Sequence, residues 1–260
     1  VHAWAMSRFS GLWSGLKTIQ EVVESSSSVW VDPDRVHIVW PEFEMPDGGL
    51  HIRWPDSALA QEARLMDHKW YAALAYVRAN RLNRTVIDSP RARLGLIASG
   101  KAYNDMRQAL VDLGIDDDMA ARLGLRVHKV GVVWPLEASI TREFATGLQE
   151  ILVVEEKRQV IEYQLKEELY NWREDVRPAV LGKFGPAEAQ GDLSGGEWSR
   201  PRPSDHWLLR AKADLNPALI AKAIAQRLEK TGLLARLDGD ARRHVACLLY
   251  TSPSPRDLST

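Results

Sequence analysis

Apolar residues recur along this chain with two different spacings, and their alternation predicts an α/β fold. Between residues 93 and 182, short and almost wholly apolar runs alternate with segments whose apolar residues lie three or four positions apart. The runs are typical of strands covered on both faces, and the wider spacing is typical of helices. The predicted strands are residues 94–98, 125–133, 151–154 and 179–181, and the predicted helices between and after them centre on residues 103–113, 116–123, 140–148 and 161–172. This order predicts a parallel sheet with right-handed crossovers.

The pattern before residue 93 is less regular but predicts further elements of both kinds. Helical spacing over residues 3–23 ends at four serines, which compete for backbone hydrogen bonds. β-Branched and aromatic residues predict strands at 29–31 and 36–40, followed by a loop over 41–55. A helix capped by Asp56 or Ser57 is then expected to end near residue 80, before a short strand at 85–87. Residues 88–91 are the expected domain boundary.

The residue composition of the chain changes twice after residue 185. Residues 186–203 are rich in Gly, Pro and Ser and predict a flexible linker, after which Asn216 and Pro217 predict the start of one more helix. Residues 247–260 fit no earlier pattern and resemble a translated sequencing adapter, so this tail is interpreted as non-native. Because the chain begins with Val1, it is interpreted as a fragment.

Composition narrows the possible functions. A net charge of −1 gives no field that favours nucleic acid or an anionic membrane, and no apolar run approaches the roughly 18 residues of a membrane span. The single cysteine, Cys247, excludes a disulfide within the chain, and the seven histidines show no zinc-binding spacing, so no metal site is predicted. Scarce cysteine is typical of a reducing compartment, so a cytoplasmic location is expected. The ten tryptophans are interpreted mainly as core filling.

Eight candidate site residues follow three predicted strands on one edge of the predicted sheet. They are Ser99, Gly100 and Lys101 after the first strand, Trp134, Pro135 and Glu137 after the second, and Glu155 and Glu156 after the third. Open α/β sheets bind ligands at the carboxyl ends of their strands, so this is the candidate ligand or domain-interface edge. Backbone N–H groups after Ser99 suit an anion, although a tight turn is the alternative. The glutamates suit acid–base chemistry, although helix capping or ion pairing is the alternative.

Several of these segments resemble the bacterial indolepyruvate ferredoxin oxidoreductases, which are long, fused 2-oxoacid:ferredoxin oxidoreductases. The resemblance covers residues 1 to about 246 and is carried by WAMSRFSG (4–11), KTIQE (17–21), GLHIRWP (49–55), DSPRARLG (88–95), GKAY (100–103), KVGVVWPLE (129–137) and ILVVEEKR (151–158).

The resemblance implies a thiamine diphosphate enzyme that oxidatively decarboxylates an aryl pyruvate, forms an acyl-CoA and reduces ferredoxin. Residues 1–88 would be the C-terminal part of the pyrimidine-binding domain, and 92–185 a transketolase C-terminal-like domain. Residues 186–246 would be a linker and helix leading to a missing diphosphate-binding domain. The catalytic residues, the Mg site and the iron–sulfur cysteines would lie outside this chain, which alone would neither turn over nor bind the cofactor fully.

The resemblance also implies partners: the missing domains of the same chain, ferredoxin, CoA, a 2-oxoacid and a second copy in a homo-oligomer. Two alternatives remain open on the sequence. The first is a module of another 2-oxoacid oxidoreductase. The second is a non-catalytic α/β domain that binds an anionic ligand or a partner at the Ser99/Trp134 edge.

Overall fold

A computed structural model of the chain describes residues 1–185, 198 and 207–250, and it divides into two units. The first unit comprises residues 1–82, and the second begins at Asn83. The linker predicted at 186–203 therefore lies outside the described residues, apart from Trp198.

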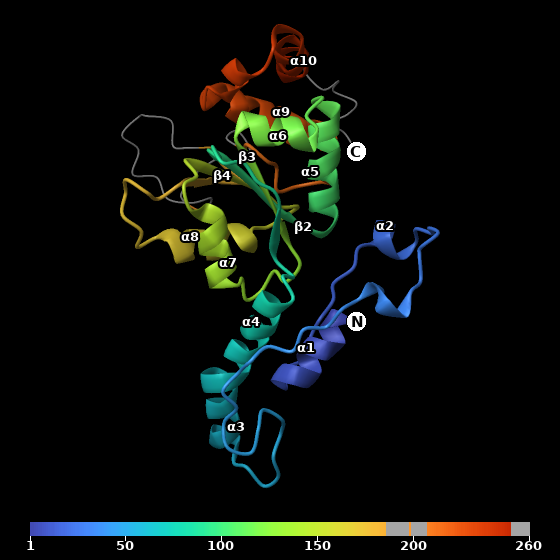
Figure 1. Ribbon diagram of the computed structural model, residues 1–260, viewed down its shortest axis with the longest axis vertical. Coiled ribbons are helices and arrows are strands. Elements are labelled where there is room, and N and C mark those ends of the chain that lie inside the picture. Colours follow the sequence, from blue (N-terminus) through green and yellow to red (C-terminus); the bar gives the residue numbers. More distant parts are fainter. Residues whose placement is uncertain (186–197, 199–206, 251–260) are drawn as a thin grey trace. The chain divides into compact units, whose positions relative to one another are not determined.

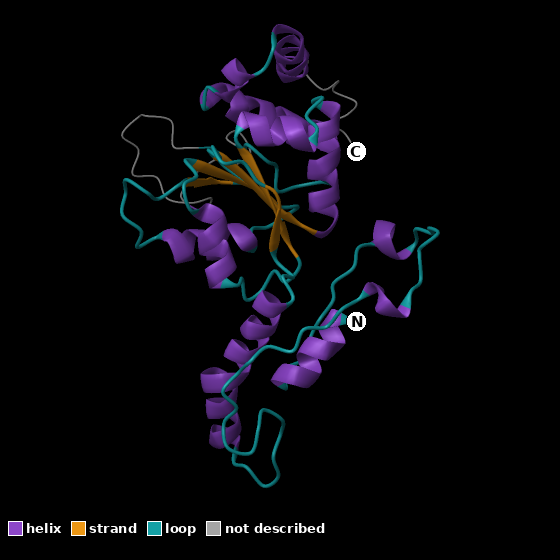
Figure 2. Cartoon of the chain, viewed as in Figure 1, coloured by secondary structure: helices purple, strands orange, loops and turns teal. Residues whose placement is uncertain are grey.

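The first unit is helical (Figure 2). Its elements are α1 (His2–Ser10), α2 (Gln20–Val23), the 3₁₀ helix η1 (Pro33–Arg35), α3 (Ala58–Arg64), the π-helical turn η2 (Leu65–Lys69) and α4 (Trp70–Ala79). The helix predicted from Asp56 or Ser57 is confirmed as the run from α3 to α4, and the Ser57 side chain accepts a hydrogen bond from the backbone N–H of Ala60. Asn80 follows its last residue, as predicted.

The helix predicted over residues 3–23 is wrong beyond Ser10. Gly11 ends α1 in the left-handed region, with φ of 69°. A Cβ at this position would lie 2.4 Å from the carbonyl oxygen of Leu50, so the chain turns here where only glycine fits.

The strands predicted at 29–31 and 36–40 are also absent. Trp30 lies in a segment without regular secondary structure, where its carbonyl accepts a hydrogen bond from the Arg35 guanidinium, and Val39 exchanges two hydrogen bonds with the side-chain amide of Asn80. The described part of the first unit contains no strand with which either segment pairs, so β propensity alone does not produce a ladder here.

The core of the first unit is aromatic. Tyr76 is fully buried, and the rings of Phe9 and Trp40 lie 6.2 and 6.1 Å from its ring, with Phe43 6.3 Å from Phe9. These contacts hold α1 and the segment between η1 and α3 against α4.

The second unit is a five-stranded sheet between two helical layers (Figure 1). Its strands are β1 (Arg84–Ile87), β2 (Leu94–Ser99), β3 (Leu125–Val130), β4 (Glu150–Val154) and β5 (Ala179–Leu181), in the order β1-β3-β2-β4-β5. Its helices are α5 (Gly100–Asp112), α6 (Asp117–Leu123), α7 (Ala138–Ala145), α8 (Ile161–Leu169), α9 (Pro217–Lys230), the 3₁₀ helix η5 (Leu233–Arg236) and α10 (Gly239–Tyr250).

The predicted α/β class with a mostly parallel sheet is confirmed. The ladders of β2 with β3, β2 with β4 and β4 with β5 are all parallel. Two details differ. The short strand β1 pairs antiparallel with β3 at the sheet edge, and β3 ends at Val130 rather than at residue 133. β1 precedes the boundary expected at 88–91, yet it lies in the second unit.

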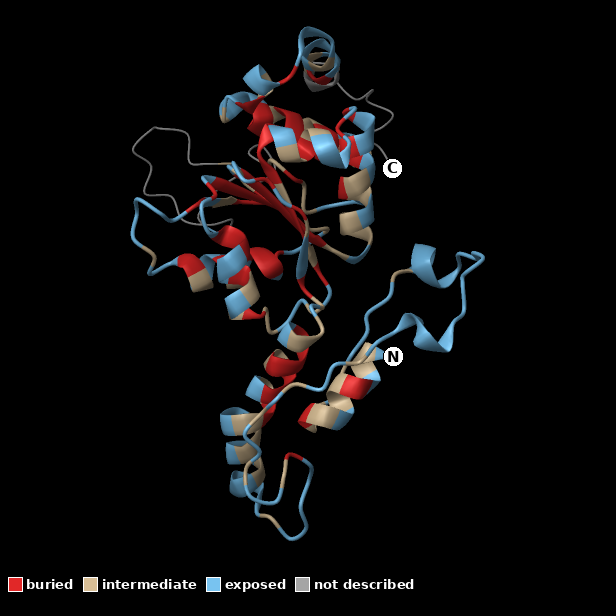
Figure 3. Ribbon diagram, viewed as in Figure 1, coloured by how far each residue is buried: buried red, intermediate tan, exposed pale blue. Residues whose placement is uncertain are grey.

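Two apolar clusters fill the two sides of the sheet, and its central strands β2, β3 and β4 are largely buried (Figure 3). Helices α5, α6 and α9 cover one face, while α7 and α8 cover the other. α9 begins at Pro217 as predicted, with Asn216 capping it, and it packs along α5. Gly95 lets α7 approach the sheet closely, because a Cβ there would lie 2.8 Å from Phe144.

Candidate functional site

The candidate edge lies where β2, β3 and β4 end, and the eight predicted residues are distributed over both helical layers. β2 connects to α5 on one face, and β4 connects to α8 on the other. The chain therefore leaves two neighbouring parallel strands in opposite directions, which is the arrangement of a topological switch point. The side chains on this edge decide whether it is open to a ligand.

After β2, the polar groups are used within the fold. The Ser99 hydroxyl donates to the carbonyl of Val130 at 2.7 Å, which ties β2 to β3. Gly100 begins α5 with φ of 55°, and Lys101 donates to Asp105 at 2.7 Å and to the carbonyl of Leu215 at 3.3 Å. The geometry therefore matches the alternative of a tight turn, and Lys101 is engaged by the chain itself.

After β4, the glutamates bind backbone N–H groups. The carboxylate of Glu155 accepts hydrogen bonds from Val160, Ile161 and Glu162, at 2.7 Å from Ile161, and so caps the start of α8. Burial raises the pKa of Glu155, and the nearby Glu162 acts in the same direction, whereas the three backbone hydrogen bonds oppose the rise. Glu156 accepts from the backbone N–H of Leu215 at 3.3 Å.

Replacing Glu155 with alanine is expected to cost about 1–2 kcal/mol of unfolding free energy, because three N–H groups at the start of α8 lose their acceptor. Urea denaturation measures this loss. The matched control is Glu156→Ala, which removes one 3.3 Å bond and is expected to cost less than about 0.5 kcal/mol. Equal losses in the two variants would contradict a capping role for Glu155.

Segment 207–215, here called the rim segment, covers much of this edge. It pairs with the chain after β5 through a bridge between Phe184 and Trp207 and a hydrogen bond from Leu208 to the carbonyl of Lys183. Lys157 then donates to the carbonyl of Ala213 at 2.8 Å. Glu156 and Lys101 both bond to Leu215 at the end of the rim segment. The rim segment is therefore held along its length, from the chain after β5 to the start of α5.

Lys183 is the buried residue of this edge that sequence reasoning missed. Its side chain is 1% exposed, and its ammonium donates to the carbonyls of Glu155 and Arg210, so it joins β4 to the rim segment. Its backbone N–H donates to Glu162, which is also buried and pairs with Lys166 at 2.6 Å. The available signal was a Gly-Lys pair directly after the apolar run at 179–181.

After β3, the edge opens into a groove between α7 and α8. The cavity measures about 570 Å³ and is lined by Trp134, Pro135, Leu136, Ala138, Thr141, Gln164, Glu167, Glu168 and Asn171. Trp134 is 60% exposed, and the peptide bond to Pro135 is cis. Glu137 is buried instead and caps α7 by accepting from the N–H of Ile140 at 2.6 Å. Of the eight predicted residues, only Trp134 and Pro135 line this groove.

The described residues hold no group of three or more His, Cys, Asp or Glu side chains suited to a metal ion. Among the same residues, no helix has the length and apolarity needed to cross a membrane.

Comparisons with known proteins give similarities along most of the chain. Residues 83–251 match the family described as the indolepyruvate ferredoxin oxidoreductase middle domain. The chain is 27% identical over 205 residues to the indolepyruvate oxidoreductase subunit IorA of Methanothermobacter thermautotrophicus, covering 71% of this chain and 32% of that protein. It is 32% identical over 92 residues to the IorA subunit of Thermococcus kodakarensis, covering 35% of this chain and 13% of that protein.

Among solved structures, a 2-oxoglutarate:ferredoxin oxidoreductase from Magnetococcus marinus aligns with a TM-score of 0.33 and 12% identity, covering 58% of this chain and 24% of that one. A split-gene transketolase aligns with a TM-score of 0.30 and 16% identity, covering 64% and 41%. The chain spans about a third of the length of the IorA subunit of Methanothermobacter thermautotrophicus, the first relative given above.

Proposed function

Because the chain belongs to the indolepyruvate ferredoxin oxidoreductase family, through the middle domain that residues 83–251 match, we propose that it is part of a thiamine diphosphate-dependent enzyme. In this proposal the whole protein oxidatively decarboxylates indolepyruvate or another aryl pyruvate, forms an acyl-CoA and reduces ferredoxin. The match over residues 83–251 is the observation that carries the proposal. Residues 1–88 would belong to the pyrimidine-binding domain, and the sheet of residues 92–185 would be the transketolase C-terminal-like domain.

The residues of this chain do not fit an iron–sulfur cluster or a metal-bound diphosphate. A cluster of the usual kind takes four thiolates, and the chain has one cysteine. The described residues offer no three-ligand acidic or histidine group for Mg²⁺ either. We therefore assign this chain the part of a scaffold and interface, and place the cofactor, the metal and the cluster in other parts of the protein or in partner subunits.

This division of labour predicts the behaviour of the purified 260-residue chain. With indolepyruvate, CoA, thiamine diphosphate and Mg²⁺, we expect no reduction of ferredoxin and no tight cofactor binding in calorimetry. A longer gene product, extended on both sides and purified without oxygen, is expected to reduce ferredoxin with indolepyruvate. Turnover by the 260-residue chain would contradict the assignment of a scaffold.

The substrate arm of the same experiment separates the alternatives. Pyruvate and 2-oxoglutarate serve as matched 2-oxoacids without an aromatic side chain. Faster ferredoxin reduction with either one than with indolepyruvate would favour another 2-oxoacid oxidoreductase. An extended product that oxidises none of the three, although loaded with thiamine diphosphate, would overturn the enzyme proposal and favour a non-catalytic binding domain at the Ser99/Trp134 edge.

A further inference from the structure

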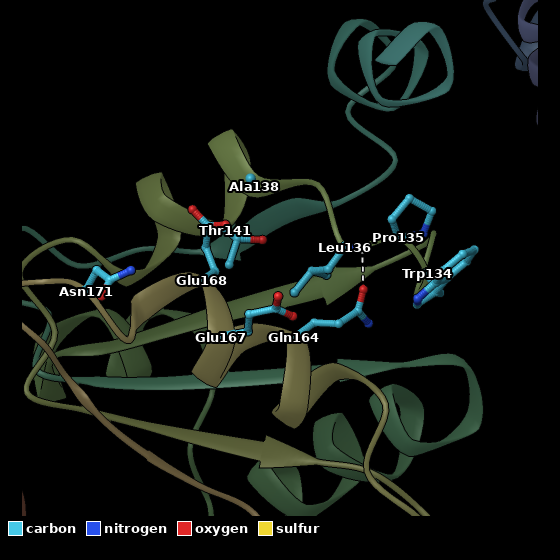
Figure 4. Close-up of a pocket in the computed structure, with 9 residues that line it drawn as sticks. All are labelled: Trp134, Pro135, Leu136, Ala138, Thr141, Gln164, Glu167, Glu168 and Asn171. Atoms are coloured by element: carbon cyan, nitrogen blue, oxygen red, sulfur yellow. Dashed lines mark hydrogen bonds between the residues drawn. The ribbon is translucent and has the colours of Figure 1, made fainter. Parts of the chain in front are cut away.

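Four exposed arginines lie together at the amino ends of β2 and β3, where α6 ends and β3 begins (Figure 1). They are Arg91, Arg93, Arg122 and Arg236, and we call them the arginine edge. The opposite edge of the sheet, where β3 runs into Trp134 (Figure 4), carries the groove described above. The arginine edge is therefore a separate surface of the second unit.

The turn at Gly124 brings the four arginines together. The backbone N–H of Arg93 donates to the carbonyl of Gly124 at 2.8 Å, and the guanidinium of Arg236 donates to the last carbonyl of α6 at 2.6 Å. A Cβ at Gly124 would lie 2.5 Å from that guanidinium and 2.6 Å from the carbonyl oxygen of Arg91. Arg122 lies in the last turn of α6, directly before Gly124 and its neighbour. Three segments that are far apart in the sequence thus place arginines beside one turn.

Two carboxylates at this end of the sheet already have arginine partners, and neither partner belongs to the arginine edge. Asp88, after β1, bonds Arg126 at 2.7 Å, and Glu150, at the start of β4, bonds Arg227 at 2.5 Å. Among the described residues, no carboxylate forms an ion pair with any arginine of the edge. The edge therefore carries several positive charges that the described part of the chain does not neutralise.

Recognition at this edge depends on guanidinium groups rather than on backbone N–H groups. The N–H of Arg91 donates to the Ser89 hydroxyl at 3.2 Å, and those of Arg93 and Gly124 donate to carbonyls of the fold. Compact phosphate sites typically add unpaired N–H groups at a helix start or a turn, and these N–H groups are engaged. The net charge of −1 gives no overall field for a polynucleotide. Arginines presented by three segments favour an extended partner with several carboxylates.

We propose that the arginine edge docks an acidic segment of a separate polypeptide. In this contact, aspartate and glutamate carboxylates of the partner bind the guanidinium groups, whose planar N–H forks match carboxylates in pairs. Arginine is also enriched at protein interfaces relative to the rest of the surface. This docking surface does not depend on the oxidoreductase assignment.

Fluorescence anisotropy of a labelled peptide tests this docking surface. The probe is a fluorescein-labelled peptide of Gly-Glu repeats, and the matched control is the same peptide with Gln in place of Glu. At low salt we expect saturable binding of the Glu peptide, and binding of the Gln peptide weaker by about tenfold. Raising the salt to about 0.3 M is expected to weaken binding of the Glu peptide, because the ions screen exposed charge pairs. Equal binding of the two peptides, or no saturable binding, would overturn the proposal.

A double variant locates the contact. Arg91→Gln/Arg93→Gln is expected to weaken binding of the Glu peptide by about fivefold. The matched control is Arg8→Gln/Arg84→Gln, which removes the same charge from exposed positions outside the edge, since Arg84 pairs with Lys129 at the carboxyl end of β3. This control is expected to change binding by less than about twofold. Melting temperatures confirm that both double variants remain folded. Binding that falls no further in the edge variant than in the control would refute this site.

A further arm separates a polypeptide from a nucleic acid. A fluorescein-labelled oligothymidylate of similar net charge replaces the peptide, and we expect it to bind no more tightly than the Glu peptide. Tighter binding of the oligonucleotide would assign the arginine edge to nucleic acid and overturn polypeptide docking.

The longer gene product shows whether the arginine edge stays accessible in the whole protein. We expect it to bind the Glu peptide within about threefold of the affinity of the shorter chain. Loss of binding in the longer product would show that the rest of the protein covers the edge, and it would overturn docking of a separate polypeptide.

Discussion

Replacing Arg227 with leucine is expected to cost about 3–5 kcal/mol of unfolding free energy, the cost typical of leaving one buried charge without its partner. Arg227 in α9 forms two hydrogen bonds with Glu150 at the start of β4, at 2.5 and 2.7 Å, and both residues are 7% exposed. In the variant the Glu150 carboxylate remains buried without its counterion. Urea denaturation of the intact chain measures the change.

Two controls separate the buried pair from a general effect of removing arginine. The double variant Arg227→Leu/Glu150→Leu is expected to recover much of the loss, because both charges are removed together. Arg173→Leu breaks an exposed pair with Asp175 and is expected to change stability by less than about 1 kcal/mol. With Glu150→Leu as the second single variant, a loss in the double variant as large as the sum of the two single losses would contradict strong coupling across this pair.

The position of α9 in the second unit could not be predicted from the sequence, and the Arg227–Glu150 pair shows why. The helical spacing of Ile220, Ile224 and Leu228 predicts α9, but it does not say which surface the helix covers. In the structure α9 packs along α5 and enters the apolar cluster on one face of the sheet. The two charges that form the ion pair are 77 residues apart, a separation at which sequence pattern carries no pairing information.

The centre of the sheet was predictable because β2 and β4 are buried on both faces and therefore read as continuous apolar runs. The strands at 94–98 and 151–154 are confirmed as β2 and β4, each within one residue of the predicted bounds. The strand predicted at 29–31 from β-branched and aromatic residues is wrong, and these residues are exposed. A strand needs a hydrogen-bonding neighbour as well as suitable residues, and residues 29–31 show only the second.

The sequence places the eight candidate residues after strand ends, but it does not show the contacts that their side chains make. Strand ends identify the edge, because carboxyl ends of parallel strands meet there. They do not show that the rim segment crosses it, since residues 207–215 follow a long stretch without apolar periodicity. Gln164 carried no signal at all, because a helical glutamine reads as solvated, whereas its amide here fixes the loop around Trp134.

The unfolding free energy is expected to change with pH because of His128, which lies buried in β3. The centre of its ring lies 4.7 Å from that of Phe144 with the two rings tilted by 39°, and its Nδ1 lies 3.2 Å from the hydroxyl of Thr85. Burial lowers the pKa of His128 from 6.5 to about 4, and the charge of Arg126 acts in the same direction. The folded chain therefore holds this ring neutral at pH values where the unfolded chain has already protonated it.

The stability contributed by a neutral His128 is thus complete above pH 6.5 and is lost as the pH falls from 6.5 to about 4. The gap between the two pKa values corresponds to about 3 kcal/mol.

We expect His128→Gln to remove this part of the pH dependence, measured as the difference in unfolding free energy between variant and parent at each pH. Glu155 has a raised pKa and shifts stability in the opposite sense, but it is present in both proteins and cancels in the difference. Parallel profiles of parent and His128→Gln between pH 4 and 6.5 would show that the buried ring does not govern the acid response.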